Sequence, residues 1–238
     1  HIIECEIRRM TNSAVITLNR SEYQWISAES PASFALRYAC TMRKFLNATF
    51  SSDDTSRLIL QSSIETLIKE GYGDTEHQLL RNYLIDLISQ HAKIFQNRKV
   101  LDNSGNPLDP KKLAELKPES IAWMQNWRDG LLERSWRSIE RLQHNDPESP
   151  IYSVLRASSA QPSADPSMLS VQIAASDALT LTEDQIEDLL SKAKITFAQI
   201  LADEISETIA DHSQDSILQE IQLLGLNRAF VDIKTEYN

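Results

Sequence analysis

The chain has 238 residues, 41% of them hydrophobic, and a net charge of −10 at pH 7. This length and apolar fraction suffice for one large domain or two small ones, and they exclude wholesale disorder. The sequence has no run of 18 apolar residues and no apolar core of a signal peptide, so we expect a cytoplasmic protein with no membrane partner. Two cysteines are too few for a disulfide framework, which favours the same compartment.

Apolar residues recur at helical spacing along most of the chain, and Ser/Asp, Gly or Pro breaks separate the helical stretches. Residue 1 is His rather than Met, so we expect residues 1–9 to be an added remnant or the edge of a longer protein, within an extension of residues 1–30. Residues 15–18 favour a short extended segment. Helices are predicted over about residues 31–46, 54–68, 75–95, 120–142, 151–158 and 216–224, with a helix pair over 166–201.

The helical pattern fails between residues 97 and 118. This stretch contains three prolines, Asn103-Ser104-Gly105-Asn106 and scattered lysines, a composition typical of a linker. We therefore predict an all-α fold of two helical lobes: a first lobe at 31–98, a linker at 99–119, and a second lobe with a C-terminal extension at 120–238.

The most informative stretch is residues 166–201, which we interpret as a short helix, a tight turn and a longer helix. Thr182 is followed three positions later by Gln185, the spacing of a capping box that satisfies free backbone N–H groups at a helix start. Apolar residues then recur on one face of the longer helix: Ile186, Leu189, Leu190, Ala193, Phe197, Ile200 and Leu201. A pair of this form is how a helix-turn-helix DNA reader is built.

The charge of this region opposes DNA binding. The face that would meet DNA carries four acids: Glu183, Asp184, Glu187 and Asp188. Residues 31–99 hold nine Lys/Arg and seven Asp/Glu, a net +2, whereas residues 170–238 hold four against thirteen, a net −9. Phosphate binding needs clustered cations, because counterion release supplies most of the affinity. The alternative is an antiparallel packing pair whose first-turn acids complement the helix dipole.

Two helical lobes, a linker and a helix pair in the second lobe form the layout of bacterial RNA polymerase sigma factors of the extracytoplasmic-function group. The chain resembles that family over most of residues 31–226. The segments that carry the resemblance are Phe34–Tyr38, Met42–Leu46, Asp53-Asp54 with Gln61 and Ile64, Leu80–Asp86, Trp127–Trp136, Ile151–Arg156 and Lys194–Glu204. The resemblance implies a transcription initiation protein that binds core RNA polymerase and directs it to promoter DNA.

The resemblance also implies which residues meet each partner. The polymerase-binding face would consist of Asp54, Arg57, Gln61 and Glu65. The promoter DNA contacts would come from Arg81, Asn82, Lys93, Thr182, Gln185, Lys192 and Lys194. An anti-sigma factor or another regulatory protein is a further partner that the resemblance implies.

Other classes of function stay open. A degenerate relative would keep the fold as a protein-interaction or regulatory module without DNA binding, and the acidic C-terminal portion favours a basic protein partner. A third class is an anti-sigma-like regulator that mimics nucleic-acid charge. We expect no enzyme, because no GxSxG, HExxH or phosphate-binding loop occurs. The histidines have no i,i+4 partner, so neither a metal nor a cofactor is predicted. Trp123, Trp127 and Trp136 are interpreted as core residues.

Overall fold

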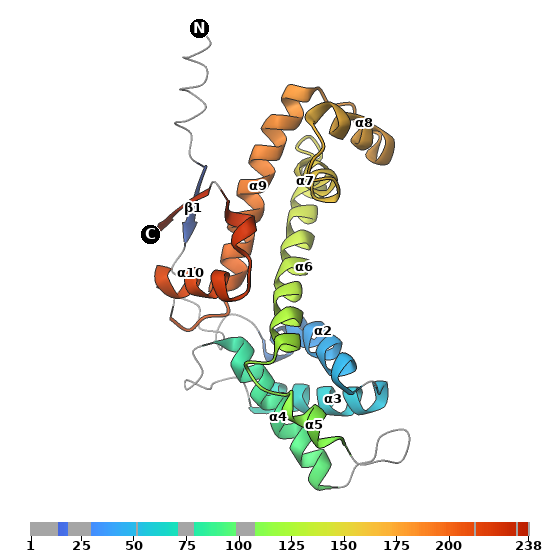
Figure 1. Cartoon of the computed structure of the whole chain (residues 1–238), viewed down its shortest axis with the longest axis vertical. Coiled ribbons are helices and arrows are strands. Elements are labelled where there is room, and N and C mark those ends of the chain that lie inside the picture. Colours follow the sequence, from blue (N-terminus) through green and yellow to red (C-terminus); the bar gives the residue numbers. More distant parts are fainter. Residues whose placement is uncertain are drawn as a thin grey trace. The chain divides into compact units, whose positions relative to one another are not determined.

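The computed structural model describes residues 14–18, 30–50, 52–70, 79–98, 108–211, 213–231 and 233–237. These ranges are mostly helical, which confirms the predicted all-α fold class (Figure 1). The helices are α2 (Pro31–Phe50), α3 (Asp53–Glu70), α4 (Leu80–Asn97), α5 (Pro110–Ala114), α6 (Ile121–Asn145), α7 (Ile151–Ala160), α8 (Pro166–Asp177), α9 (Glu183–Ser206) and α10 (Gln214–Leu223). The other elements are strands β1 (Ala14–Leu18) and β2 (Ile233–Tyr237) and the 3-10 helix η1 (Asn227–Phe230). No helix in the described ranges is both long and apolar enough to span a membrane.

The segment predicted as a linker is partly folded. Helix α5 lies within it, with Pro110 in its first turn and the Asp109 carboxylate accepting a hydrogen bond from the Lys111 backbone N–H at 2.9 Å. Such a cap and a proline at the helix start stabilise even a short helix. Leu113 and Leu116 are buried, and α5 packs against α4. Residues 99–107, and residues 75–78 of the predicted third helix, lie outside the described residues.

The chain divides into two compact units. Unit 1 is formed by His1–Asn19, Leu132–Glu204 and Gly225–Asn238, and unit 2 by Arg20–Leu131 and Ile205–Leu224, as far as these ranges are described. Helices α6 and α9 therefore contribute residues to both units. This division differs from the predicted lobes, because the start of α6 belongs with the N-terminal helices.

Aromatic contacts explain that difference. Trp127 stacks on Tyr38 of α2 with ring centroids 5.5 Å apart, and Trp123 meets Phe45 edge-on at 5.2 Å. Both tryptophans are almost fully buried, which confirms that they are core residues. Aromatic pairs of this kind contribute about 0.5–1.5 kcal/mol beyond the burial of their area. The first turns of α6 are thus part of the core of unit 2.

Gly130 allows α6 to lie close to α2. A Cβ atom at this position would fall inside van der Waals contact of Thr41 Oγ1 and 3.4 Å from both other side-chain carbons of Thr41. Thr41 is itself buried, so it has little room to move away. Glycine in a helix interior lowers helix stability by about 1 kcal/mol relative to alanine. Its presence here indicates that the position requires a residue without a side chain, so that the two helices can pack closely.

Replacing Gly130 by alanine should therefore destabilise the protein. Overpacking of a core costs about 1–3 kcal/mol, which exceeds the gain in helix propensity of about 1 kcal/mol. Urea unfolding followed by circular dichroism would measure the change. Adding Thr41→Ala to Gly130→Ala should recover part of the loss, because it removes the clashing hydroxyl. Equal or greater stability of Gly130→Ala alone would contradict the close contact.

Unit 1 is held together around the aromatic ring of Trp136. This half-buried side chain meets Phe197 of α9 at a centroid distance of 4.9 Å and Tyr152 of α7 at 6.1 Å. Beside it, Arg134 Nε donates to Glu204 Oε2 at 2.8 Å, and both side chains are mostly buried. These contacts join α6, α7 and α9 within unit 1. Trp136 is thus a partly buried member of a core, as its spacing indicated.

Strands β1 and β2 pair in parallel, with Ala14 opposite Ile233 and Leu18 opposite Tyr237. Gln199 of α9 binds this small sheet: its Oε1 accepts from the Thr17 N–H at 2.9 Å, and its Nε2 donates to the Thr17 carbonyl at 2.7 Å. The same Nε2 donates to Asp203 Oδ1 at 2.9 Å. Burial raises the pKa of the Asp203 carboxyl, and the neighbouring Glu204 charge acts in the same direction. The extended segment predicted at 15–18 is confirmed, whereas β2 was not predicted.

Candidate functional site

The predicted helix pair of residues 166–201 is present as α8 and α9, joined by a short connector (Figure 1). The Asp165 carboxylate caps α8 by accepting from the Met168 N–H at 2.8 Å. Ala178, the residue after α8, has the left-handed backbone conformation that often terminates helices. Ser170 Oγ then donates to the Leu181 carbonyl at 2.7 Å, so the connector lies against the second turn of α8.

Helix α9 begins with the capping box that the sequence indicated. The Thr182 N–H donates to Gln185 Oε1 at 2.9 Å, and the Gln185 N–H donates to Thr182 Oγ1 at 3.3 Å. These reciprocal bonds satisfy two of the free N–H groups at the helix start. Thr182 and Gln185 remain exposed, and the Thr182 hydroxyl and the Gln185 side-chain carbonyl are engaged in the cap.

The inner faces of α7, α8 and α9 share one apolar core. It consists of Val154, Ala157, Leu169, Ile173 and Ile186, with Ala164, Leu179, Leu181, Leu189 and Leu190 packed against it. An ion pair supports this core, because Arg156 Nη2 of α7 lies 2.7 Å from Asp177 Oδ1 at the end of α8. The hydrogen bond to Asp177 raises the pKa of Arg156. A common core and an anchored end give the helix pair a defined geometry.

The outer face of α9 is acidic. Glu183, Asp184, Glu187 and Asp188, here called the acidic cluster, are all exposed, while Ile186 between them is buried. The predicted DNA contacts Lys192 and Lys194 are exposed on the next turns, and Lys192 Nζ donates to Ser149 Oγ at 2.9 Å. Residues 157–191 contain no Lys, Arg or His. The structure therefore places two lysines beside four carboxylates.

The predicted polymerase-binding residues lie together on α3. Asp54, Arg57, Gln61 and Glu65 are all exposed and recur three or four positions apart, the spacing of one helical face. Arg57 Nη2 lies 3.4 Å from Asp54 Oδ1, and Gln61 Nε2 donates to Glu65 Oε1 at 2.8 Å. This face is available to a partner, and its four polar side chains form two exposed pairs.

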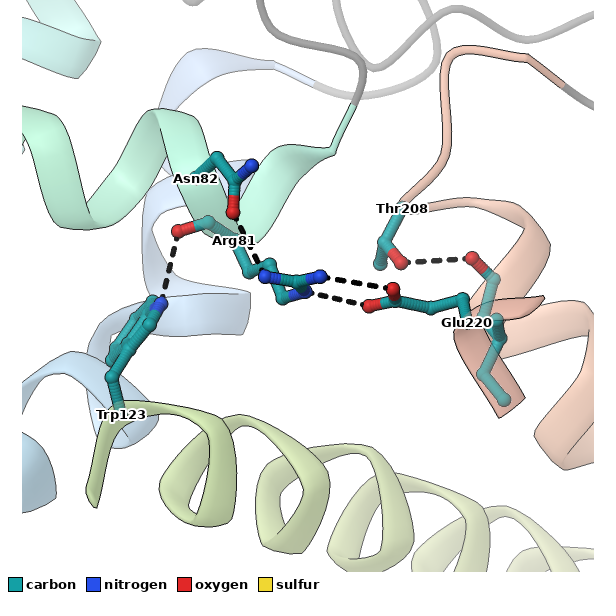
Figure 2. A network of polar contacts seen from close by, with 6 residues as sticks. Arg81, Asn82, Trp123, Thr208 and Glu220 are labelled. Carbon is teal, nitrogen blue, oxygen red and sulfur yellow. Dashed lines mark hydrogen bonds and ion pairs between the residues drawn. The ribbon is translucent and has the colours of Figure 1, made fainter. Parts of the chain in front are cut away.

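Arg81 does not have the environment that its predicted role requires. Figure 2 shows its guanidinium facing the Glu220 carboxylate of α10: Nε lies 2.7 Å from Oε1, and Nη2 donates to Oε2 at 3.1 Å. Only 8% of the Arg81 side chain and 2% of the Glu220 side chain are exposed. A guanidinium buried in a two-point ion pair cannot offer these donors to a phosphate. The DNA contact predicted for Arg81 is therefore a structural ion pair.

The surroundings of Arg81 reinforce this structural role. Its Nη1 donates to Asn82 Oδ1 at 2.9 Å, so half-buried Asn82, another predicted DNA contact, is also engaged (Figure 2). The Arg81 carbonyl accepts from Trp123 Nε1 at 3.1 Å, and the Leu80 N–H donates to the Thr208 carbonyl at 2.9 Å. Of the predicted contacts in this helix, Lys93 is exposed. Sequence reasoning missed Glu220, because its partner lies 139 positions away and no local pattern marks it.

Breaking the Arg81–Glu220 pair should be costly. Arg81→Met leaves the Glu220 carboxylate buried without its cation, which we expect to lower the free energy of unfolding by about 3–5 kcal/mol. The double variant Arg81→Met/Glu220→Leu removes both charges and should be clearly more stable than Arg81→Met alone. Arg57→Met is the matched control, because its exposed pair with Asp54 contributes at most about 1 kcal/mol. Urea unfolding that shows equal effects for Arg81→Met and Arg57→Met would contradict a buried ion pair.

Within the described part of the chain, no three His, Cys, Asp or Glu side chains are grouped so that they could hold a metal ion. Comparison of the chain with protein-family models, with curated proteins and with solved structures gives no match. Function must therefore be argued from the surfaces of the molecule itself.

Proposed function

We propose that this chain is a sigma-like protein-interaction and regulatory module, and that its α8–α9 pair binds a protein rather than promoter DNA. The observation that carries this proposal is the exposure of all four carboxylates of the acidic cluster on the outer face of α9. A helix-turn-helix protein would present the start of this helix to the major groove.

Electrostatics argue against a DNA duplex on this face. Duplex DNA carries one negative charge per about 1.7 Å of its axis, so a bound helix meets a dense row of phosphates. Residues 157–191 supply no cation to that row, and the acidic cluster would be forced against it. A single carboxylate can accept a hydrogen bond from cytosine, but four of them face mainly repulsion. A basic protein surface, in contrast, would be attracted.

A complete sigma factor is the second candidate function. It is favoured by the exposed row of Asp54, Arg57, Gln61 and Glu65 on α3, which the resemblance assigns to core RNA polymerase. As a complete sigma factor, the protein would bind the polymerase through α3 and direct it to promoter DNA. A complete sigma factor does not explain why the outer face of α9 is acidic.

Charge reversal on α9 tests whether the acidic cluster keeps DNA away from this face. Glu187→Lys with Asp188→Lys should raise nonspecific affinity for a labelled DNA duplex by at least about tenfold at low salt, and should steepen the salt dependence by about 2 in slope. Fluorescence anisotropy at several salt concentrations measures both quantities.

The matched control for this experiment is Glu65→Lys with Asp215→Lys, which makes the same change of net charge at exposed positions on two different helices of unit 2. Its DNA affinity should rise much less. If the wild-type chain already binds the duplex tightly and the reversal on α9 changes nothing, the acidic cluster does not govern DNA binding and the proposal fails.

A further inference from the structure

The small sheet of β1 and β2 differs at its two outer edges. The backbone N–H and C=O groups of a strand point to its two sides at alternate residues. At Thr17 both groups bond to the Gln199 side chain, so Thr17 points away from β2 and its neighbour Ile16 points toward β2. The Gln199 amide therefore occupies the outer edge of β1 at Thr17.

The register of the sheet shows which backbone groups of β2 point outward. In a parallel ladder, a residue that points toward the neighbouring strand bonds to the residues on either side of its partner. The partner of Ile16 is Thr235, so Lys234 and Glu236 direct their backbone groups toward β1. The residues whose backbone groups point away from β1 are Ile233, Thr235 and Tyr237. Within the described residues the sheet ends at β2, so this outer edge is open to another strand.

The sequence of β2 is complementary to itself when two copies run in opposite directions. Pairing centred on Thr235 places Lys234 of each copy opposite Glu236 of the other. It also places Thr235 opposite Thr235, and Ile233 opposite Tyr237. Opposite charges, two threonines, and an aromatic residue with a β-branched one are the cross-strand pairs that stabilise antiparallel strands. In this register the outward backbone groups of the two strands also face each other.

We propose that two copies of this chain associate through the outer edges of their β2 strands, which run antiparallel across a two-fold axis. The two small sheets would then form one sheet of four strands. Main-chain hydrogen bonds between the β2 strands would supply affinity, and the cross-strand pairs would supply specificity. Isolated two-stranded sheets are marginally stable in water, so both copies would gain from the association. Self-association through β2 goes beyond the proposed function and does not depend on it.

Charge selects both the register and the occupant. If the pairing moved toward either end of β2, Lys234 would stand opposite Lys234, or Glu236 opposite Glu236. Like charges directly opposite each other destabilise a strand pair, so the centred register is favoured. An extended segment of another protein would meet the same backbone groups, but it would need this order of charges in reverse. A second copy of the chain supplies that order by symmetry.

A charge-swap experiment on the full chain tests this proposal. Sedimentation equilibrium at up to about 0.5 mM protein, in the range of weak but specific affinities, should show a dimer. The salt concentration is set near 0.15 M, where a Debye length of about 8 Å screens the repulsion between two negatively charged chains. Lys234→Glu should weaken dimerisation by about tenfold, because both symmetric pairs become Glu opposite Glu. Glu236→Lys should do the same.

The swap has a result that a general charge effect does not produce. Mixing the Lys234→Glu chain with the Glu236→Lys chain should restore the dimer, and so should both substitutions in one chain. Lys69→Glu on α3 is the matched control: it makes the same change of net charge as Lys234→Glu at another exposed position, and dimerisation should persist.

These substitutions should leave the sheet within each copy intact. The residues paired with Lys234 and Glu236 in β1 are Val15 and Thr17, which carry no charge. Circular dichroism and urea unfolding of the monomer should therefore be unchanged. Thr235→Pro removes an N–H that points away from β1, so it should abolish the dimer and spare the β1–β2 ladder.

Three results would overturn the proposal. The first is a chain that stays monomeric over the whole concentration range. The second is a dimer that persists in both Lys234→Glu and Thr235→Pro, because another surface then forms it. The third is a dimer that both single charge reversals weaken but that their mixture does not restore, because the strands are then not paired in the antiparallel register.

Discussion

The buried ion pair between Arg81 and Glu220 is a contact on which the position of α10 within unit 2 depends. Removing each charge from water costs on the order of several kcal/mol of free energy. Only a close, doubly hydrogen-bonded geometry offsets that cost. The pair meets this requirement and ties α10 to α4, near the Leu80–Thr208 backbone bond. Residues 205–224 therefore belong with the N-terminal helices. The same contact occupies the arginine that the family resemblance would assign to DNA.

Internal contacts also hold helix α8 in place within unit 1. Helix α8 is anchored from inside by an apolar core and from its end by the Arg156–Asp177 pair, so its outer face needs no further contact for stability. That face is nevertheless apolar, and the acidic cluster on α9 is followed by Lys192 and Lys194 on the next turns. The negative charge of the acidic cluster is the feature that leads us to propose a basic protein partner.

Helices were predictable from the sequence because their signals are local. Apolar spacing, the Thr182–Gln185 capping box and the Pro and Asp caps act within one or two turns, and the structure has these helices and the box. Contacts between distant segments have no such signal. The pairing of β1 with β2 and the Arg81–Glu220 ion pair join positions more than 130 residues apart, and neither was predicted.

The two compact units differ from the predicted lobes for a related reason. Prolines and the Asn-Ser-Gly-Asn stretch mark a break in helical pattern, but they do not show which neighbouring helices share a core. The stacking of Trp127 on Tyr38 and the fit of Gly130 against Thr41 decide that question for the start of α6. The site residues show the same contrast: α3 holds its predicted face exposed, whereas Arg81 is enclosed by a partner that sequence spacing cannot reveal.

The proposed function requires that the outer face of α9 does not read DNA. The most direct test measures promoter-duplex binding over a range of salt concentrations, for the chain alone and in the presence of core RNA polymerase, with and without Lys192→Ala and Lys194→Ala. We predict the same affinity and the same salt slope for wild type and variant in both mixtures. A variant that binds more weakly, with a slope reduced by about 1 for each lysine removed, would contradict the claim.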